Sequence, residues 1–383
     1  MNIPFSKVDC SGNELKYIQQ VLESGWLTTA GRCAEFEKRF AEYIGVKHVC
    51  AVNSCTAALH LAAEAIGIGP GDKVFVPTMT FTASGEVIRY LGGEPVILDV
   101  EYGTNLLTPE ILEAAAVKHP DAKAVMVVHY GGQAADMKGI IEVSNKHGLK
   151  VIEDAAHAFP TKYQNKYVGG FGNATCFSFY ANKTITTGEG GMLATNDESI
   201  YNRAKAMRLH GINRDIWDRF TAKNAKWEYD VIAPGFKYNM PDLNAAVGLA
   251  QMERAEEFRL GRQRCAEHYY KELGEVSELD LPIYRGKMEE HSWHLFSIVL
   301  NERARISRNQ FIQELNSRGI GTSVHYKPIH RMTYWKERYQ LRAEDFPVAE
   351  RIWKGNLSLP IYPGMTPEEL TYVTDTLKSL LVR

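Results

Sequence analysis

The stretch from Cys176 to Gly191 constrains the fold and the chemistry of this chain more than any other. An apolar, aromatic-rich run carries Ser178, a single lysine follows at position 183, and a Gly-Glu-Gly-Gly turn leads into a short apolar strand. This pattern predicts a buried strand that delivers Lys183 into a tight cavity built with glycines. A buried lysine loses its hydration, which favours the neutral form of the amine. A neutral amine can attack a carbonyl carbon to form a Schiff base. The alternative is a solvated loop lysine, which is the commoner case for an isolated lysine.

Short apolar segments alternate with helical patterns over the first part of the chain. This spacing is typical of an α/β fold with a mostly parallel sheet covered by helices. In such folds ligands bind beyond the carboxyl ends of the strands. Strands are expected at 49–52, 73–77, 95–100, 124–129, 149–152 and 192–194. Helices are expected at 11–24, 33–44, 83–91, 137–147 and 198–209, with others opening near 54 and 108.

The rest of the chain predicts a second, smaller domain. A long helix is expected over 241–260, and we place the boundary near its end. Beyond it the pattern is α+β and of typical domain size. It comprises strands at 293–300 and 322–325 and helices at 309–317 and 367–381. The prediction is a large α/β domain at 1–255 and a small C-terminal α+β domain at 256–383.

Composition excludes several classes of function. Apolar residues make up 45%, charged residues 23%, and the net charge is −2, so no strong field attracts nucleic acid or an anionic membrane. No apolar stretch is long enough to span a bilayer, and no signal-peptide pattern opens the chain. Six cysteines without CxxC spacing favour reduced thiols in a cytoplasmic protein. Scattered histidines predict no metal site, and a GxGxxG motif is missing after the first strand.

Two features would suit a flat, phosphorylated ligand. Thr56 and Ala57 lie where a strand runs into a helix, where backbone amides and the Ser54 and Thr56 hydroxyls can bind an anion. Phe81 lies at another strand-to-helix turn, where an aromatic ring can stack on a flat ligand. Taken singly, N-capping and core packing explain these residues at least as well.

A carboxylate and the lysine complete the set. Asp154 stands just past a buried strand, where a negative charge can keep a ring nitrogen protonated. Ser178 and Lys183 follow on the next strand. Pyridoxal 5′-phosphate (PLP) is the ligand that these features indicate together: an anion site, an aromatic ring, a carboxylate and a lysine, each after a different strand.

The same stretches resemble the DegT/DnrJ/StrS family of sugar-nucleotide aminotransferases, which have fold type I of the PLP enzymes. The similar segments are 24–31, 53–60, 151–157, 178–191 and 235–242. The resemblance implies that the large domain binds PLP, that Lys183 is the Schiff-base lysine and that Asp154 pairs with the pyridine nitrogen. It also implies that His157 lies near the ring hydroxyl. The phosphate contacts implied are Thr56, Ala57 and Ser178, and the stacking aromatic is Phe81.

The resemblance further implies a homodimer whose active site is shared. In the family, the segment that matches 235–239 reaches the phosphate of the neighbouring subunit. Many members have Asn-Tyr-Arg where this chain has Lys237, Tyr238 and Asn239. Either Lys237 or Asn239 could therefore contact the neighbour's phosphate, and an ammonium suits phosphate as a point charge.

Within the family, the chain is closest to the subgroup that makes UDP-4-amino-4-deoxy-L-arabinose. The similar segments are 209–212 with 215–219, 233–239, 291–296 and 319–326. The implied reaction transfers an amino group from L-glutamate, which leaves as 2-oxoglutarate, to a UDP-linked 4-keto sugar for lipopolysaccharide or other modified sugars. Candidate substrate residues are Trp26, Thr28, His129, Tyr130, Glu189, His210 and His325. Arg214 and Arg219 are candidates for the diphosphate.

Four alternatives stay open at this point. One is an aminotransferase for a TDP- or GDP-linked 3- or 4-keto-6-deoxy sugar. The second is a PLP-dependent sugar dehydratase, although that branch has histidine where this chain has Lys183. The others are a PLP-bound sensor fused to a DNA-binding module, for which no basic extension is present, and a nucleotide-binding oxidoreductase.

Overall fold

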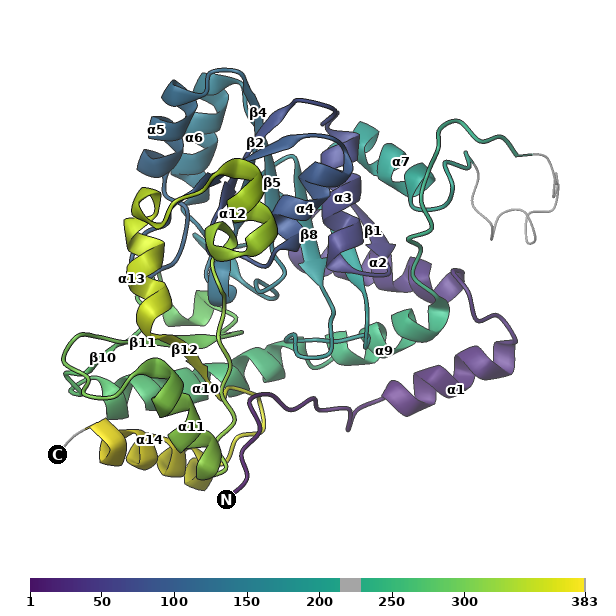
Figure 1. Ribbon diagram of the computed structural model, residues 1–383. Helices are drawn as coiled ribbons and strands as arrows, with labels where there is room; N and C mark the ends of the chain where they lie inside the picture. Colours follow the sequence, from purple (N-terminus) through teal and green to yellow (C-terminus); the bar gives the residue numbers. More distant parts are fainter. Residues whose placement is uncertain (214–228, 382–383) are drawn as a thin grey trace.

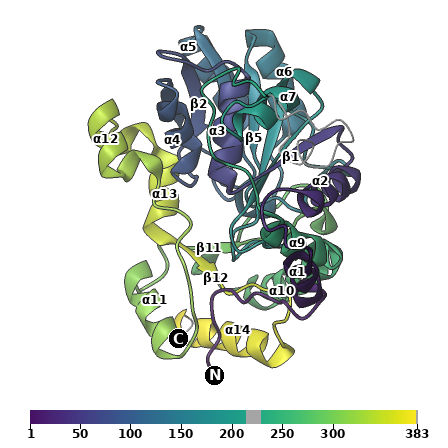
Figure 2. The same cartoon turned by 90° about the vertical axis from the view of Figure 1, so that its right-hand side faces the viewer.

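The computed structural model describes residues 1–213 and 229–381. A large α/β part, built around one sheet, lies above a smaller part that holds the C-terminal helix (Figure 1). Seen from the side, strands β11 and β12 of the smaller part lie below the large sheet (Figure 2). No helix in the described ranges is long and apolar enough to cross a membrane.

The large sheet has seven strands in the order β1-β9-β8-β5-β4-β2-β3. Strands β3, β2, β4, β5 and β8 pair in parallel, whereas β9 runs antiparallel to both β8 and β1. This confirms the prediction of a mostly parallel sheet. The strands are β1 His48–Val52, β2 Lys73–Pro77, β3 Glu94–Leu98, β4 Ala122–Val128, β5 Lys150–Asp154, β8 Ala174–Ser178 and β9 Gly191–Thr195.

Helices cover both faces of this sheet, because alternate residues of each strand are apolar on opposite sides. Val74, Val76 and Met126 pack with α3, α4 and α7 on one face, while Phe75 and Val125 pack with α5 and α6 on the other. Helices α2 and α9 cover the remaining end of that second face. The helices are α2 Gly31–Ile44, α3 Cys55–Ala65, α4 Ala83–Tyr90, α5 Pro109–Lys118, α6 Met137–His147, α7 Glu198–Met207 and α9 Asp242–Met252.

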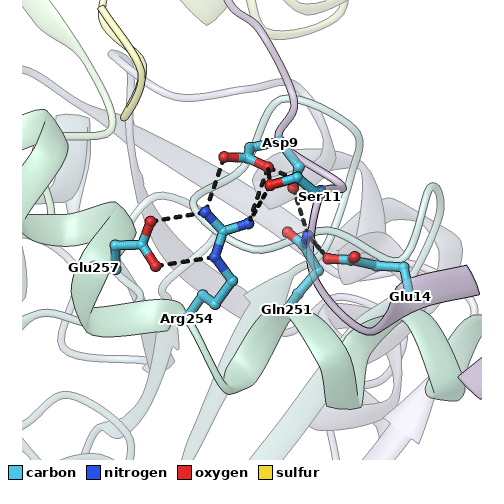
Figure 3. A network of polar contacts seen from close by, with 6 residues as sticks. All are labelled: Asp9, Ser11, Glu14, Gln251, Arg254 and Glu257. Atoms are coloured by element: carbon cyan, nitrogen blue, oxygen red, sulfur yellow. Dashed lines mark hydrogen bonds and ion pairs between the residues drawn. The ribbon is translucent and has the colours of Figure 1, made fainter. Parts of the chain in front are cut away.

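The single helix expected over 241–260 is wrong, since the chain forms α9 and then α10, Ala255–Leu273. Arg254 stands at the break with non-helical backbone angles (φ −115°, ψ 9°). Its guanidinium binds the Asp9 carboxylate at 2.9 and 3.0 Å and also Glu257 (Figure 3). Gln251 donates to the Asp9 carbonyl at 2.8 Å and to buried Glu14 at 2.6 Å. The break thus anchors the N-terminal segment, which the helical periodicity alone does not reveal.

The smaller part is built on a three-stranded antiparallel sheet. Its strands are β10 Leu279–Asp280, β11 Phe296–Leu300 and β12 Asn356–Leu359, and its helices are α10, α11 Arg308–Ser317 and α14 Pro367–Leu381. The strand expected at 322–325 is wrong: only Ser323 pairs, through a single bridge to Ser358. Ile3 from the chain start also belongs to this core. The division of the chain at 255/256 stays a prediction.

The remaining elements are short or lie at the edges of the two parts. They are α1 Glu14–Ser24, α12 Thr333–Tyr339, α13 Pro347–Gly355, β6 Lys162–Tyr163 and β7 Lys166–Tyr167, with 3-10 turns at Tyr130–Gly132, Met288–Glu290, Ile329–Arg331 and Ala343–Asp345. Helix α13 lies between the large part and α11 in both views (Figures 1 and 2).

Candidate active site

A cavity of about 480 Å³ opens at the carboxyl ends of β4, β5 and β8. The last residues of these strands, Val128, Asp154 and Ser178, all line it. Parallel strands present their carboxyl ends at one edge of a sheet, which is where ligands of such folds bind. The rest of the wall comes from Ser54, Cys55, Thr56, Leu59, Thr80, Phe81, Ala83, Ala156, His157, Tyr180, Asn182, Lys183, Glu189, Gly190, His325 and Tyr326.

Lys183 projects from a tight loop between β8 and β9. The loop is closed by backbone bonds from Phe179 to Gly190 (2.9 Å) and from Lys183 to Tyr180 (3.0 Å). Burial lowers the pKa of Lys183 to about 8, and the positive charge of Arg262 acts in the same direction. The Cys55 thiol and Asp154 oppose this shift. The neutral, nucleophilic form of the amine is therefore populated at a lower pH than in a solvated lysine.

Arg262 lies near Lys183 and could not be identified from any sequence pattern. Its side chain is buried, and among the described residues its guanidinium donates only to carbonyl oxygens: Ile361 at 2.9 Å, His294 at 3.3 Å and Asn182 at 3.5 Å. Burial lowers the pKa of Arg262 to about 10. A cation without a carboxylate beside it disfavours a second cation at Lys183.

PLP attachment to the apoprotein should accelerate with rising pH and level off above about pH 8. The reason is that the neutral form of Lys183 is scarce below its depressed pKa and predominates above it. Stopped-flow absorbance after PLP addition measures the rate at each pH. A rate that climbs steadily to about pH 10, as for a solvated lysine, would contradict this assignment.

Asp154 is the last residue of β5 rather than a residue beyond it, and it is 5% exposed. The Ser84 hydroxyl donates to Oδ2 at 2.7 Å and the Ala156 amide donates to Oδ1 at 3.1 Å. Burial raises the pKa of Asp154, while the bonds from Ser84 and Ala156 and the charge of Lys183 lower it. A buried carboxylate with two neutral donors is stabilised further by a cationic ligand group, such as a protonated ring nitrogen.

Helix α3 supplies the opposite end of the cavity. Its first residues, Cys55 and Thr56, line the wall, and Ser54 caps the helix by accepting from the Ala57 amide at 3.1 Å. The Ala57 amide is therefore engaged inside the helix cap. A side chain at Gly191 would come within 2.4 Å of the Ser54 backbone, so only glycine lets β9 pass behind this turn. The Thr56 and Ser178 hydroxyls beside a helix N-terminus suit a phosphate.

Phe81 lies in the wall with 57% of its surface exposed, and its ring centroid is 5.9 Å from that of Tyr326. An exposed aromatic ring at a cavity suits stacking on a flat ligand. Core packing, the alternative explanation of Phe81, is excluded by this exposure.

His157 is held by both ring nitrogens. Nδ1 accepts from the Gly131 amide at 3.2 Å, and Nε2 lies 2.8 Å from the Tyr326 hydroxyl. Burial lowers the pKa of His157 well below its usual value, and the charges of Lys183 and His325 lower it further. Tyr326 lies in the segment 319–326, which is similar to the family subgroup named above. No sequence pattern assigned a role to Tyr326 itself.

Two predicted substrate residues lie behind the wall rather than in it. His129 is fully buried, with Nε2 3.0 Å from Glu153 and Nδ1 accepting from the Ala135 amide at 3.1 Å. The Tyr130 hydroxyl donates to the His325 carbonyl. These contacts use the polar atoms of both side chains for structure, and neither residue lines this cavity, so their expected substrate contact stays a prediction. Glu189 and His325, by contrast, do line the cavity.

The other predicted residues lie outside the wall formed by this one chain. Asn239 donates to the Thr29 hydroxyl at 2.7 Å, and the Lys237 amine donates to Asn239 at 2.6 Å. Thr28 and His210 are exposed, and Trp26 is half-buried beside the Thr29 carbonyl. Their roles stay predictions. Arg214 and Arg219 lie outside the described residues.

These groups match the polar ends of PLP. Thr56, Ser178 and the start of α3 suit its phosphate, Asp154 its ring nitrogen, and Lys183 its aldehyde carbon. Phe81 offers a ring to the pyridine face. The residues present therefore fit the cofactor.

The sequence matches the DegT/DnrJ/EryC1/StrS aminotransferase family over residues 9–378. The spore coat polysaccharide biosynthesis protein SpsC of Bacillus subtilis is 40% identical over 381 residues, which are 99% of this chain and 97% of SpsC. Among solved structures, Spr1654 from Streptococcus pneumoniae in its PLP form is 29% identical, with a TM-score of 0.91 and coverage of 99% and 98% of the two chains. PseC from Helicobacter pylori, an aminotransferase of pseudoaminic acid biosynthesis, is 26% identical, with a TM-score of 0.91 and coverage of 100% and 99%.

Proposed function

The chain belongs to the DegT/DnrJ/EryC1/StrS aminotransferase family and is a PLP-dependent sugar aminotransferase, and we propose that it transfers an amino group from L-glutamate to a UDP-linked 4-keto sugar. The observation that carries the proposal is the placement of Lys183 and Asp154 on one cavity with an anion site and an exposed aromatic ring. The products are 2-oxoglutarate and the amino sugar.

When bound, PLP supplies a ring that accepts electrons from a carbon attached to it through nitrogen. In our proposal Lys183 would hold the cofactor through its side-chain nitrogen. Once free, the same Nζ would be placed to remove the proton from the α-carbon of glutamate. Proton transfer at such close range is efficient because donor and acceptor are already positioned.

Asp154 has an electrostatic role in this proposal. Its charge keeps the ring nitrogen protonated, so the ring withdraws electrons more strongly. The bonds from Ser84 and Ala156 fix the carboxylate, and Thr80 donates in turn to Ser84 at 2.7 Å. Thr56, Ser178 and the first amides of α3 would bind the cofactor's phosphate, and Ala57 completes the helix cap.

The sugar substrate shares this cavity with glutamate. We assign Glu189 and His325 as contacts for the second substrate, since both line the wall beside Lys183. Burial lowers the pKa of His325 to about 4, so the imidazole is neutral and its Nδ1 bonds to Ser358 at 2.9 Å. SpsC is a spore coat polysaccharide biosynthesis protein and PseC acts in pseudoaminic acid biosynthesis, which supports a sugar of a surface polysaccharide or glycan. The segments 209–212, 215–219 and 233–239 support a UDP linkage.

We also propose that the enzyme is a cytoplasmic homodimer. All six cysteines are free, as in proteins of reducing compartments. Leu15 and Leu22 are exposed on α1, at 79% and 56%, and Lys237 and Asn239 lie outside the single-chain cavity. A second copy that covers such apolar residues could bring Lys237 or Asn239 to its neighbour's phosphate.

A panel of UDP-, TDP- and GDP-linked keto sugars with L-glutamate tests the proposal. We expect the UDP-linked 4-keto sugar to be preferred by about tenfold or more in kcat/KM, because the enzyme's contacts to the base and to the keto sugar differ between substrates. Mass spectrometry of the amino sugar and an assay of 2-oxoglutarate measure turnover. Preference for a TDP- or GDP-linked sugar, or for a 3-keto sugar, would overturn the substrate assignment.

In sedimentation experiments, aminotransferase activity should be found with the dimer, and an active monomer would contradict the shared site.

A further inference from the structure

We propose that a second cavity, at the edge of the smaller part, binds a small molecule that carries a diphosphate or a similar group with at least two negative charges. The cavity has a volume of about 600 Å³, which is within the range typical of small-molecule sites. It shares no lining residue with the active-site cavity, so the inference does not depend on the function proposed above.

The cavity lies between β10, the end of β11, the loop 301–307, the start of α11 and the second half of α13. The large part contributes a single lining residue, Tyr102. Figure 1 shows β10 and α13 on the left of the molecule, opposite α1. The cavity is therefore remote from the exposed leucines of α1, which are the apolar residues that suggest the dimer contact.

Basic side chains outnumber acidic ones in this wall. Arg351 lies 3.8 Å from Asp280, whose carboxylate also accepts from the Tyr102 hydroxyl and from the Asn301 amide. The other three basic side chains form no ion pair within residues 1–213 and 229–381. This excess of positive charge favours a ligand with more than one negative charge. The basic residues are Arg303, Arg308, Arg351 and Lys354, and the acidic residues are Asp280 and Glu302.

Two of the guanidinium groups lie over aromatic rings, which holds them in place. Cζ of Arg308 is 4.3 Å from the centroid of the Trp353 ring, and Cζ of Arg351 is 3.9 Å from that of Tyr102. Arg308 donates through Nη1 to the Trp353 carbonyl at 2.8 Å and through Nε to Asn309 at 3.1 Å. Its Nη2 has no acceptor in the described ranges and is available to a ligand. An arginine fixed in this way loses little freedom on binding, and its planar fork matches two phosphate oxygens.

The surroundings of Arg308 favour an anion on physical grounds as well. Burial lowers the pKa of Arg308, because a cation without a neighbouring carboxylate is poorly solvated there. A bound phosphate would supply the missing negative charge. Val299, Leu300 and Ile306 form an apolar side of the wall, which suits the organic part of a phosphate ester or a nucleotide. A nucleic-acid strand would need a longer row of basic residues than this cavity presents.

Isothermal titration calorimetry of the PLP-loaded full chain, with inorganic diphosphate as the probe, tests the proposal. We expect saturable binding that Arg308→Gln and Lys354→Gln each weaken by about tenfold, the value of one hydrogen bond to a charged group. Lys354 is exposed, so its replacement tests the site even if Arg308→Gln fails to fold. Arg318→Gln is the matched control. This exposed arginine pairs with Glu314 at the other end of α11, outside the wall, and its replacement should leave the affinity unchanged.

A second titration with UDP distinguishes the possible sources of the phosphate groups. Tighter binding of UDP than of diphosphate, weakened by Lys354→Gln, supports a nucleotide as the ligand. Equal affinity for both probes supports a bare diphosphate, and both results agree with the proposal.

Three results would overturn this assignment. The first is no saturable binding of either probe, and the second is binding that Arg308→Gln and Lys354→Gln leave unchanged or that Arg318→Gln weakens equally. The third is tighter binding of a single-stranded oligonucleotide than of UDP, because the ligand would then be a nucleic acid. None of these titrations contains a keto sugar or an amino donor, so their outcome is separate from that of the transfer assays.

Discussion

Replacing Lys183 with alanine should abolish amino transfer and leave the fold intact. The substitution removes both the covalent attachment and the group that moves the proton, so we expect a loss of about 1,000-fold or more in the rate of 2-oxoglutarate release. Stability should hold, because removal of an amine whose burial disfavours its charge relieves a desolvation cost. Single-turnover assays with L-glutamate and thermal unfolding measure the two effects.

Lys162→Ala is the matched control, since that lysine contacts the ring of Tyr167 away from the cavity wall. Its turnover should equal that of the wild type. Turnover retained by Lys183→Ala would remove Lys183 from its role. A collapse of its melting temperature would mean instead that the amine holds the β8–β9 loop together.

Replacing Asp154 with asparagine should lower the transfer rate by about 100- to 1,000-fold while PLP stays bound. Asparagine keeps the shape and can still accept from the Ala156 amide, but it carries no charge to keep the ring nitrogen protonated. Binding of PLP should survive because Thr56, Ser178 and Lys183 are unchanged. Transfer rates and the absorbance of the bound cofactor check both statements.

Ser84→Ala calibrates this result. It removes one of the two donors to Asp154 but leaves the charge, so we expect a loss of about tenfold, the value of one hydrogen bond to a charged group. Near-normal rates in Asp154→Asn would mean that another group keeps the ring charged. A loss in Ser84→Ala as large as that in Asp154→Asn would mean that position, rather than charge, matters at this carboxylate.

The sequence predicted the parts of the site that lie directly at strand ends. Asp154, Ser178 and Lys183 follow or end consecutive parallel strands, and the geometry of a parallel sheet brings such positions together. Thr56 and Phe81 were predicted for the same reason, from the turns that follow β1 and β2. A local sequence pattern is therefore sufficient to predict site residues that lie at the same edge of the sheet.

Contacts between distant segments could not be predicted in this way. Tyr326 meets His157 across 169 positions of sequence, and Ser84 meets Asp154 across 70. Arg262 reaches the Lys183 loop from α10 through carbonyl oxygens, which leave no pattern in the sequence. His129 lies behind the cavity wall for a related reason: its position after β4 resembles a ligand position, but its side chain bonds to Glu153 on the neighbouring strand.

The element boundaries show the same limit. Strand β2 and helices α6 and α14 match their predicted bounds, because their apolar periodicity and caps are local. The break between α9 and α10 was missed because it depends on Asp9, 245 positions from Arg254. Strand β12 was missed because a segment of only four residues, Asn356–Leu359, gains its structure from pairing with β11.

Borohydride reduction of the PLP-loaded protein, followed by digestion and peptide mass spectrometry, is the sharpest test of Lys183 as the lysine that holds the cofactor. Reduction makes the bond between lysine and cofactor permanent, so the modified peptide identifies the lysine. We expect one reduced phosphopyridoxyl group per chain, on the peptide that contains Lys183. Attachment to a different lysine, or complete loss of the cofactor on denaturation after reduction, would contradict it.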